Sequence, residues 1–262
     1  MSNAPSKSRL DQLLVDNGLA ESKTKAQALI MAGQVTVDGQ ISDKSGRPTD
    51  NDADITVKDA YPYVSRGASK LEKAYNEFGL DFAGKTVCDI GSSTGGFTDF
   101  ALQHGASHVF AVDVGTGQLA QKIREDKRVV VMERTDFRDV ALPEPIDIFV
   151  CDVSFISLKK IIPKISSLLS SLSEAKDLEI LHDVQNDNAE GVDIILLIKP
   201  QFEAGAKEVS KGKGVIRDEV LRQSIVEDIK SFAENEGFTI VGLTESPITG
   251  AKGNVEYLLY LK

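Results

Sequence analysis

Four ionisable residues, far apart in the sequence, are the strongest candidates for catalysis. Asp152 follows the apolar run 146–151, and Lys199 follows the apolar-rich run 191–198. A charge at the end of a buried strand is costly unless it is paired or used, so both residues indicate a functional edge of a sheet. We expect Lys70 and Glu256 to converge on the same cleft. Two amines and two carboxylates together can remove or polarise the proton of a bound hydroxyl group.

A glycine-rich turn between an apolar run and a helical pattern indicates a cofactor loop. The run 86–90 has the branched, buried character of a central parallel strand, and helical spacing resumes at Phe97. Ligands bind at such strand-to-helix junctions in doubly wound sheets. The residues here that we expect to hold the cofactor are Asp89, Gly91, Ser92, Gly95, Gly96 and Phe97.

The next apolar run, 107–113, ends in a second acid, Asp113. It lies about 20 residues beyond the first glycine, the offset at which an acid binds ribose hydroxyls. Asp136 is a further candidate, for an adenine amine. The glycine spacing is G-x-x-x-G-G, whereas dinucleotides favour G-x-G-x-x-G and a helix N-terminus free of preceding acids. We therefore expect cationic S-adenosylmethionine rather than NAD, with Asp89 orienting its ammonium group.

Alternating apolar strands and helical patterns position these residues in an α/β fold. The connection between the last two strands is too short for a parallel crossover, so the last strand should pair antiparallel. If that strand inserts between the fifth and the sixth, Glu256 faces the ligand edge. We predict a Rossmann-like fold with a seven-stranded mixed sheet, its strands at 86–90, 107–113, 129–133, 146–152, 191–199, 238–243 and 254–261, with helices at about 70–78 and 216–236.

The chain divides near residue 62. Before this point, amphipathic helices at 9–18 and 22–32 precede short strands at 33–39 and 54–58, which predicts a small α+β domain. The expected division is therefore a small domain at 7–62, a linker and first helix bearing Lys70 at 63–82, and the α/β domain at 83–262.

Composition excludes several classes of protein. No apolar run approaches the 18 or so residues of a membrane span and no apolar leader is found, so we expect a cytoplasmic protein. The net charge is −10, but the acid-rich segment 174–190 contributes much of it and is interpreted as a solvated insertion without a catalytic role. The two cysteines, Cys88 and Cys151, are expected to be buried and reduced. The three histidines lack metal-ligand spacing, so no metal site is predicted.

The small domain resembles a known RNA-binding motif. The segments 9–14 and 22–39 closely resemble, in order, the alpha-L motif found in tyrosyl-tRNA synthetases and many pseudouridine synthases. This resemblance implies docking on structured RNA. Candidate phosphate contacts are Arg9, Lys23, Lys25 and Arg47, with Arg66 in the linker.

The order Lys70, Asp152, Lys199, Glu256 matches the catalytic tetrad of FtsJ-like 2′-O-ribose methyltransferases, and the whole chain resembles the TlyA family of rRNA methyltransferases. The matching motifs are 65–71, 89–99, 151–157 and 199–203. The resemblance implies S-adenosylmethionine-dependent methylation of a cytidine ribose in large-subunit rRNA, and in one subgroup also small-subunit rRNA. Lys199, favoured as a base by desolvation and by cationic Lys70, would remove or polarise the 2′-hydroxyl proton, with Asp152 and Glu256 orienting it.

Ribose is also favoured over an exocyclic base amine as the methyl acceptor. Amine methyltransferases usually place an Asn/Asp-Pro-Pro-aromatic loop after the fourth strand, whereas this chain has Asp152-Val-Ser-Phe155.

Three alternatives remain open at this point. A non-catalytic RNA-binding or ribosome assembly factor would need no tetrad. A haemolysin, a label attached to this family, would need a membrane-active segment, and none is found. An NAD-dependent dehydrogenase would bind NADH instead. The sequence leaves the oligomeric state, the target nucleotide and the ribosomal subunit undetermined.

Overall fold

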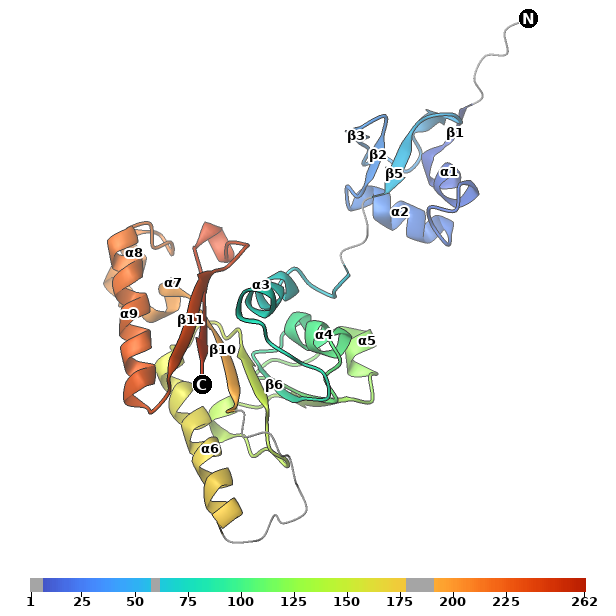
Figure 1. Cartoon of the computed structure of the whole chain (residues 1–262). Coiled ribbons are helices and arrows are strands. Elements are labelled where there is room, and N and C mark those ends of the chain that lie inside the picture. Colours follow the sequence, from blue (N-terminus) through green and yellow to red (C-terminus); the bar gives the residue numbers. More distant parts are fainter. Residues whose placement is uncertain (1–6, 58–61, 178–190) are drawn as a thin grey trace, which may run out of the picture. The chain divides into compact units, whose positions relative to one another are not determined.

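The computed structural model describes residues 7–57, 62–177 and 191–262 (Figure 1). The chain forms two compact units, Met1–Pro62 and Tyr63–Lys262. The predicted assignment of 63–82 as a separate linker and helix segment stays a prediction. The acid-rich segment lies mostly outside the described residues.

The N-terminal unit packs two helices with short strands. Its core consists of Leu10, Leu14, Ala26, Leu29, Ile30, Val35 and Val37. The strands β1 and β4 pair antiparallel, and a second antiparallel sheet has the order β3-β2-β5. The elements are β1 (Lys7–Arg9), α1 (Leu10–Asp16), α2 (Lys23–Met31), β2 (Val35–Val37), β3 (Gln40–Ile41), β4 (Pro48–Asp50) and β5 (Ile55–Val57). The sequence did not predict β1 or β4, because Lys-Ser-Arg and Pro-Thr-Asp lack the β-branched apolar residues that mark β2 and β5.

The second unit is built on one seven-stranded sheet, in the order β11-β12-β10-β9-β6-β7-β8. The last strand, β12, runs antiparallel to both β10 and β11, while the other neighbours pair parallel. The predicted mixed sheet with its inserted antiparallel strand is therefore confirmed. The strands are β6 (Thr86–Ile90), β7 (His108–Asp113), β8 (Val129–Glu133), β9 (Ile148–Cys151), β10 (Asp193–Ile198), β11 (Ile240–Glu245) and β12 (Tyr257–Leu261).

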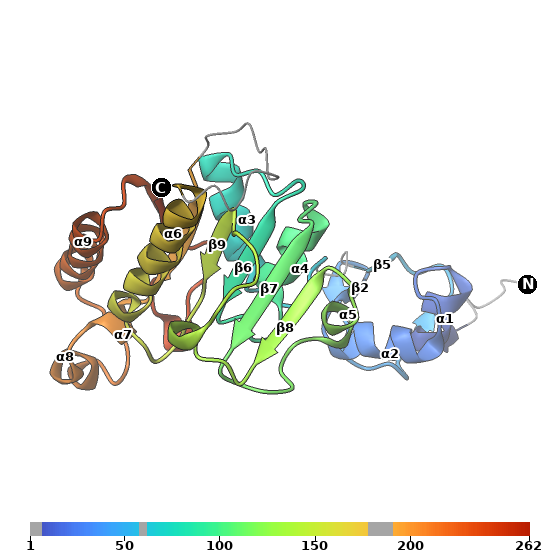
Figure 2. The same cartoon turned by 90° about the horizontal axis from the view of Figure 1, so that it is seen from below.

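Helices cover both faces of this sheet (Figure 2). On one face lie α3 (Ala68–Phe78), α4 (Gly96–Gln103) and α5 (Gln121–Arg124); on the other lie α6 (Ile162–Asp177) and α9 (Glu219–Asn235). Short helices follow the strands: η1 (Phe137–Asp139), η2 (Leu158–Lys160), α7 (Pro200–Glu203), α8 (Ala206–Lys211) and η3 (Ala251–Gly253). The predicted helix 216–236 begins at Glu219 because Asp218 caps it, accepting a hydrogen bond from the Leu221 N–H at 3.2 Å.

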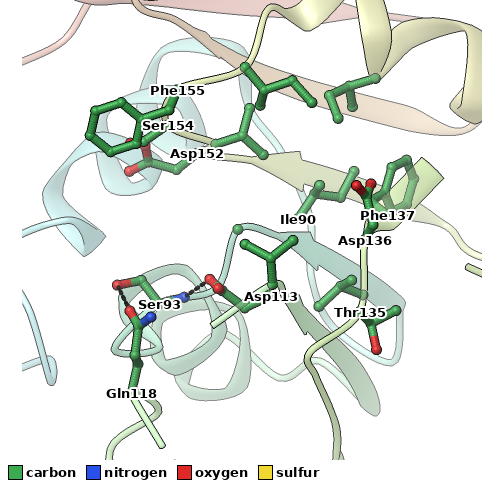
Figure 3. A pocket seen from close by; sticks show the side chains of 16 residues that line it. Ile90, Ser93, Asp113, Gln118, Thr135, Asp136, Phe137, Asp152, Ser154 and Phe155 are labelled. Carbon is green, nitrogen blue, oxygen red and sulfur yellow. Dashed lines mark hydrogen bonds between the residues drawn. The ribbon is translucent and has the colours of Figure 1, made fainter. Parts of the chain in front are cut away.

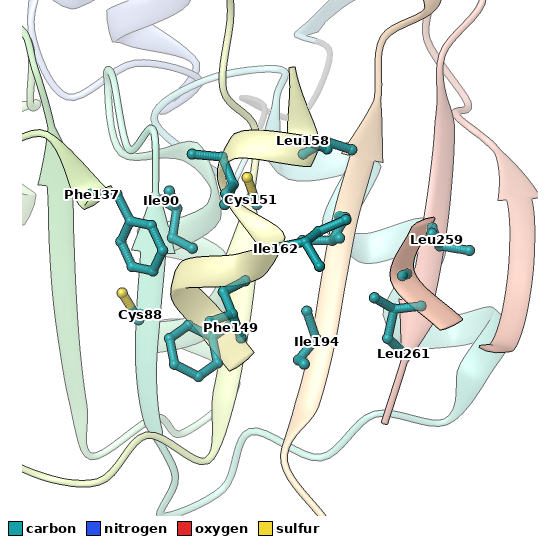
Figure 4. Packing of buried hydrophobic residues seen from close by; sticks show 14 of the residues in the cluster. Cys88, Ile90, Phe137, Phe149, Cys151, Leu158, Ile162, Ile194, Leu259 and Leu261 are labelled. Carbon is teal, nitrogen blue, oxygen red and sulfur yellow. The ribbon is translucent and has the colours of Figure 1, made fainter. Parts of the chain in front are cut away.

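Alternation along the strands divides the core into two layers. Cys88, Ile90 and Phe149 pack with Ile162 on the α6 face (Figure 4). Their neighbours on β6 and β9 point to the opposite face, toward α3 and α4. Because both faces are covered, polar groups can reach solvent only at the strand ends. The carboxyl ends of β6, β7, β9 and β10 are therefore where a site can form.

Candidate active site

The four predicted catalytic residues come together at the carboxyl edge of the sheet. Lys70 lies in the first turn of α3, Asp152 follows β9, Lys199 follows β10, and Glu256 precedes β12. The Lys70 ammonium group lies 2.8 Å from Glu256 Oε2 and 3.2 Å from Asp152 Oδ2. The Lys199 ammonium group lies 2.5 Å from Asp152 Oδ1. Asp152 therefore bridges the two lysines, and Glu256 is connected to Asp152 through its ion pair with Lys70.

These charges are largely withdrawn from solvent. Glu256 is 2% exposed, and Lys70 and Lys199 are each 7% exposed. Burial lowers the pKa of Lys70, but the carboxylates of Asp152 and Glu256 outweigh this effect, so its pKa is raised above the ordinary value. The charged form of Lys70 is therefore favoured, and it pairs with two carboxylates.

Two neighbouring side chains form hydrogen bonds with members of the tetrad. Lys199 Nζ donates to Ser154 Oγ at 2.8 Å, and Gln201 Nε2 donates to Glu256 Oε1 at 3.3 Å. Neither partner was singled out from the sequence. Ser154 lies in the matching motif 151–157 and Gln201 in the motif 199–203, so motif membership was the available signal.

A cleft of about 290 Å³ contains the tetrad and part of the glycine-rich turn. Asp89, Ser92, Gly96 and Phe97 line it, as do all four tetrad residues. Asp89 is 1% exposed and accepts hydrogen bonds on Oδ2 from the Thr98 N–H at 2.9 Å and the Thr98 hydroxyl at 2.6 Å. Burial is the main reason why the pKa of Asp89 is raised, to about 7.

A second cavity of about 440 Å³ adjoins the first, and Gly91, Asp152 and Phe155 line both. Asp113, at the end of β7, accepts hydrogen bonds from the Ser93 N–H at 2.8 Å and the Gly115 N–H at 2.7 Å. Figure 3 shows Asp113 beside Ser93, with Asp152 and Phe155 across the cavity. The structure thus brings Asp113 and the turn together as walls of one hollow.

Asp136 also lines this second cavity, but its carboxylate already accepts hydrogen bonds from Arg138. It caps η1 by accepting from the Arg138 N–H at 3.0 Å, and Arg138 Nε donates to it at 2.9 Å. The bonds from Arg138 lower the pKa of Asp136 to about 2. Asp136 is therefore already an anion with a partner, and any contact with a ligand shares it with Arg138.

Gly91 and Gly95 both have positive φ angles, but a side chain at each position would meet a different neighbour. A Cβ on Gly91, whose φ is +83°, would lie 3.0 Å from the carbonyl oxygen of Asp152. Gly95 lines neither cavity: its φ is +91°, and a Cβ there would lie 2.9 Å from Leu119 Cδ1. Gly91 therefore keeps the turn close to the tetrad, whereas Gly95 allows the turn to pack on Leu119.

Phe155 is a feature that sequence reasoning missed. It has a φ of +65°, unusual for an aromatic residue, and is 89% exposed. Its ring centroid lies 4.8 Å from that of Phe202. A large apolar side chain held out at the mouth of both cavities is a candidate contact for a ligand.

The candidate RNA-binding residues of the N-terminal unit are at its surface. Lys23, Lys25 and Arg47 are exposed, and so is Arg66 in the second unit. Arg9 is also exposed, but its guanidinium group pairs with buried Asp11 at 2.7 Å. The hydrogen bond from Arg9 is the main reason why the pKa of Asp11 is lowered to about 2. Arg9 therefore already pairs with a carboxylate at the start of α1, whatever else it binds.

Among the described residues, no group of three or more histidine, cysteine, aspartate or glutamate side chains could hold a metal ion. None of the described helices has an apolar stretch long enough to cross a lipid bilayer.

Family models match both units of the chain. The model described as FtsJ-like methyltransferase matches residues 63–262, and the S4 domain model matches residues 8–52. The first of these matches spans more than half of the sequence.

Individual proteins match over nearly the whole chain. The 16S/23S rRNA (cytidine-2′-O)-methyltransferase TlyA of Mycobacterium tuberculosis is 40% identical over 98% of this chain and 90% of its own length. Hemolysin A of Brachyspira hyodysenteriae is 44% identical over 96% of this chain and 98% of its own length. A solved structure from Streptococcus thermophilus is 39% identical, with a TM-score of 0.67 over 98% of this chain and 89% of that one. The chain therefore belongs to the FtsJ-like methyltransferases and, among them, to the TlyA family, in which an S4 domain precedes the enzyme unit.

Proposed function

We propose that this enzyme transfers a methyl group from S-adenosylmethionine to the 2′-hydroxyl of a cytidine ribose in ribosomal RNA. The observation that carries the proposal is the buried Lys70–Asp152–Lys199–Glu256 cluster, which opens directly onto a cavity beside the glycine-rich turn. A methyl donor and an acceptor hydroxyl must meet at one point, and the two adjoining hollows provide a place for each.

The walls of these hollows suit the proposed cofactor. Within the described part of the chain, the buried Oδ1 of Asp89 has no hydrogen-bond partner, and an ammonium group would satisfy it. Each oxygen of Asp113 accepts one backbone N–H and keeps a lone pair for a ribose hydroxyl. When bound, S-adenosylmethionine would supply a methyl group attached to a positively charged sulfur.

The tetrad would prepare the acceptor oxygen. In this proposal Lys199 Nζ takes or polarises the proton of the 2′-hydroxyl while the oxygen forms its bond to the methyl carbon. The bond between that carbon and the sulfur would break at the same time, and the neutral thioether S-adenosylhomocysteine would leave. Asp152 and Ser154 fix the Lys199 nitrogen, since both contact it directly. Lys70 and Glu256 are positioning residues, because they act on the acceptor through Asp152. Holding the reacting atoms close and aligned contributes as much as basicity does.

The substrate class follows from the relatives and from the mouth of the site. The Mycobacterium tuberculosis relative is named for methylating cytidine 2′-oxygens in 16S and 23S rRNA, and the S4 domain suits an RNA partner. The exposed ring of Phe155 and the partly buried ring of Phe202 offer an aromatic surface on which the base of the target nucleotide would stack. We infer that the partner is a ribosomal subunit.

Methyl transfer to defined rRNA tests the proposal. Purified protein is incubated with S-adenosyl[methyl-³H]methionine and ribosomal subunits from a strain that lacks the modification, and the RNA is digested to nucleosides. We expect the label in 2′-O-methylcytidine. Label in a base-methylated nucleoside would refute ribose as the acceptor, and binding of the subunits without any transfer would favour a non-catalytic assembly factor. NADH binding in place of S-adenosylmethionine would favour a dehydrogenase, and leakage of liposomes would favour a haemolysin.

A further inference from the structure

A third hollow, shallow and of about 610 Å³, continues outward from the tetrad cleft. Phe155, Gln201 and Phe202 line both the cleft and this hollow. Lys213 and Lys252, which come from separate segments of the chain, line this hollow but not the cleft. A single strand of RNA that leaves the cleft over the rings of Phe155 and Phe202 would therefore reach these lysines next.

The surface around this hollow is basic in an acidic protein. The segments 204–217 and 246–253 contain five bases and one acid, whereas the whole chain has a net charge of −10. That acid, Glu208, pairs with Lys211 at 2.7 Å. Among the described residues lining the hollow, two are lysines and none is a carboxylate. Such a local excess of positive charge favours a polyanion.

The two lysines sit on matching, sterically constrained turns. Lys213 and Lys252 have φ angles of +52° and +60°, and each is followed by a glycine that also has a positive φ. Lysine seldom adopts this left-handed conformation. Residues are kept in such conformations when the surrounding structure over-determines them, which happens most often at functional sites.

Asn254 fixes the two turns to each other. Its side-chain Nδ2 donates to the carbonyl oxygens of Gly214 and Ala251, each at 2.9 Å, and its Oδ1 accepts from the Ile216 N–H at 3.1 Å. Asn254 is 2% exposed, so these bonds are shielded from water. Lys252 Nζ lies 3.5 Å from the Lys213 carbonyl oxygen. Asn254 therefore links the turn that carries Lys213 to the turn that carries Lys252. It lies two residues before the tetrad residue Glu256.

We propose that Lys213 and Lys252 form a binding site for the RNA backbone, holding the phosphodiesters that flank the target nucleotide. This inference rests on the proposed function, since it takes the target ribose to lie in the tetrad cleft. RNA alternates bases with phosphates, and the aromatic pair followed by a lysine pair has the same alternation along the path out of the cleft. The open hollow gives little enclosure to a small anion, so the site acts through a strand that is already anchored at its target.

Two measurements on the full-length chain test this site. The first is the binding of a 20-nucleotide single-stranded RNA at several salt concentrations, with the K213A/K252A variant. Losing two phosphate contacts should reduce the slope of log K against log [salt] by about 1.4, since each contact to a single strand contributes about 0.7. The second is methyl transfer to the ribosomal subunits, where we expect KM for RNA to rise about tenfold with kcat and S-adenosylmethionine affinity unchanged.

A matched control separates a defined site from overall charge. K211A/K230A removes the same number of charges, one from α8 and one from α9, at positions that do not line the hollow. The proposal is overturned if this control weakens RNA binding as much as K213A/K252A, or if K213A/K252A lowers kcat with KM unchanged. If the wild-type protein transfers no methyl group, the proposed function fails, while the salt dependence of RNA binding still tests Lys213 and Lys252.

Discussion

Removing the charge of Lys70 should destabilise the enzyme unit and abolish activity through separable effects. In the K70M variant, Asp152 keeps Lys199 at 2.5 Å, but Glu256, 2% exposed, keeps only the Gln201 amide at 3.3 Å. Leaving one member of a buried ion pair without its partner typically costs about 3 to 5 kcal/mol. For a unit of this size, that corresponds to a fall of roughly 10 °C in the midpoint of thermal unfolding.

A second substitution distinguishes stability from catalysis. Replacing both members of a buried pair by apolar residues is often neutral, so K70M/E256L should recover most of the lost midpoint while remaining inactive in methyl transfer. Thermal unfolding followed by circular dichroism, together with labelled methyl transfer, measures the two effects. The reasoning is refuted if K70M unfolds at the wild-type temperature. It is equally refuted if the stabilised double variant transfers methyl groups at the wild-type rate.

Asp89, Phe155 and Gly250 are the sites of further tests. Asp89 has a pKa raised to about 7, so its ionised fraction increases from pH 6 to 7.5 and S-adenosylmethionine should bind about eightfold more tightly by calorimetry, a change that D89N removes. The stability of the fold should change with pH in the opposite direction. A carboxyl group whose folded-state pKa is raised contributes stability at low pH, and this contribution is lost as the pH rises from about 4 to 7. The free energy of unfolding, measured by denaturation, should therefore decline less over this range in D89N. F155A should leave the unfolding midpoint unchanged, because the ring is 89% exposed, and raise KM for RNA about tenfold in the transfer assay; an unchanged KM would exclude stacking. A Cβ on Gly250 would lie 1.9 Å from Glu256 Oε1, so G250A should lower the transfer rate at least about tenfold, whereas G205A, whose Cβ meets nothing within 4 Å, should not; equal rates would contradict the proposed role of Glu256.

The sequence was sufficient to predict the sheet and the convergence of the tetrad for a geometric reason. The short connection before the last strand excluded a parallel crossover, so this strand had to pair antiparallel. Its insertion between β10 and β11 was the condition on which the position of Glu256 depended, and the strand order meets it. Once that order is set, Asp152, Lys199 and Glu256 must share one edge, because the ends of neighbouring strands meet there. Their catalytic roles stay predictions.

What the sequence could not predict depends on loop conformation. The outward position of Phe155 follows from a positive φ, which its residue type does not suggest. The contacts of Ser154 and Gln201 depend on where two loops end in space, and periodicity carries no such information. Gly95 was expected to contact the cofactor, but packing against Leu119 accounts for its lack of a side chain.

The N-terminal unit shows the same limit. Its two helices followed from apolar spacing and a glycine stop, whereas the pairing of β1 with β4 joins segments about 40 residues apart. Arg9 was expected to bind phosphate, and only the structure reveals its pairing with buried Asp11.

The central claim is that Lys199 acts on the acceptor hydroxyl, and single-turnover methyl transfer by K199A tests it most directly. The rate is measured with saturating cofactor and unmodified ribosomal subunits, alongside S-adenosylmethionine affinity and the unfolding midpoint. We predict a rate lower by about a thousandfold, with the affinity for S-adenosylmethionine and the fold retained. A folded, cofactor-bound K199A protein that methylates rRNA at the wild-type rate would contradict the account.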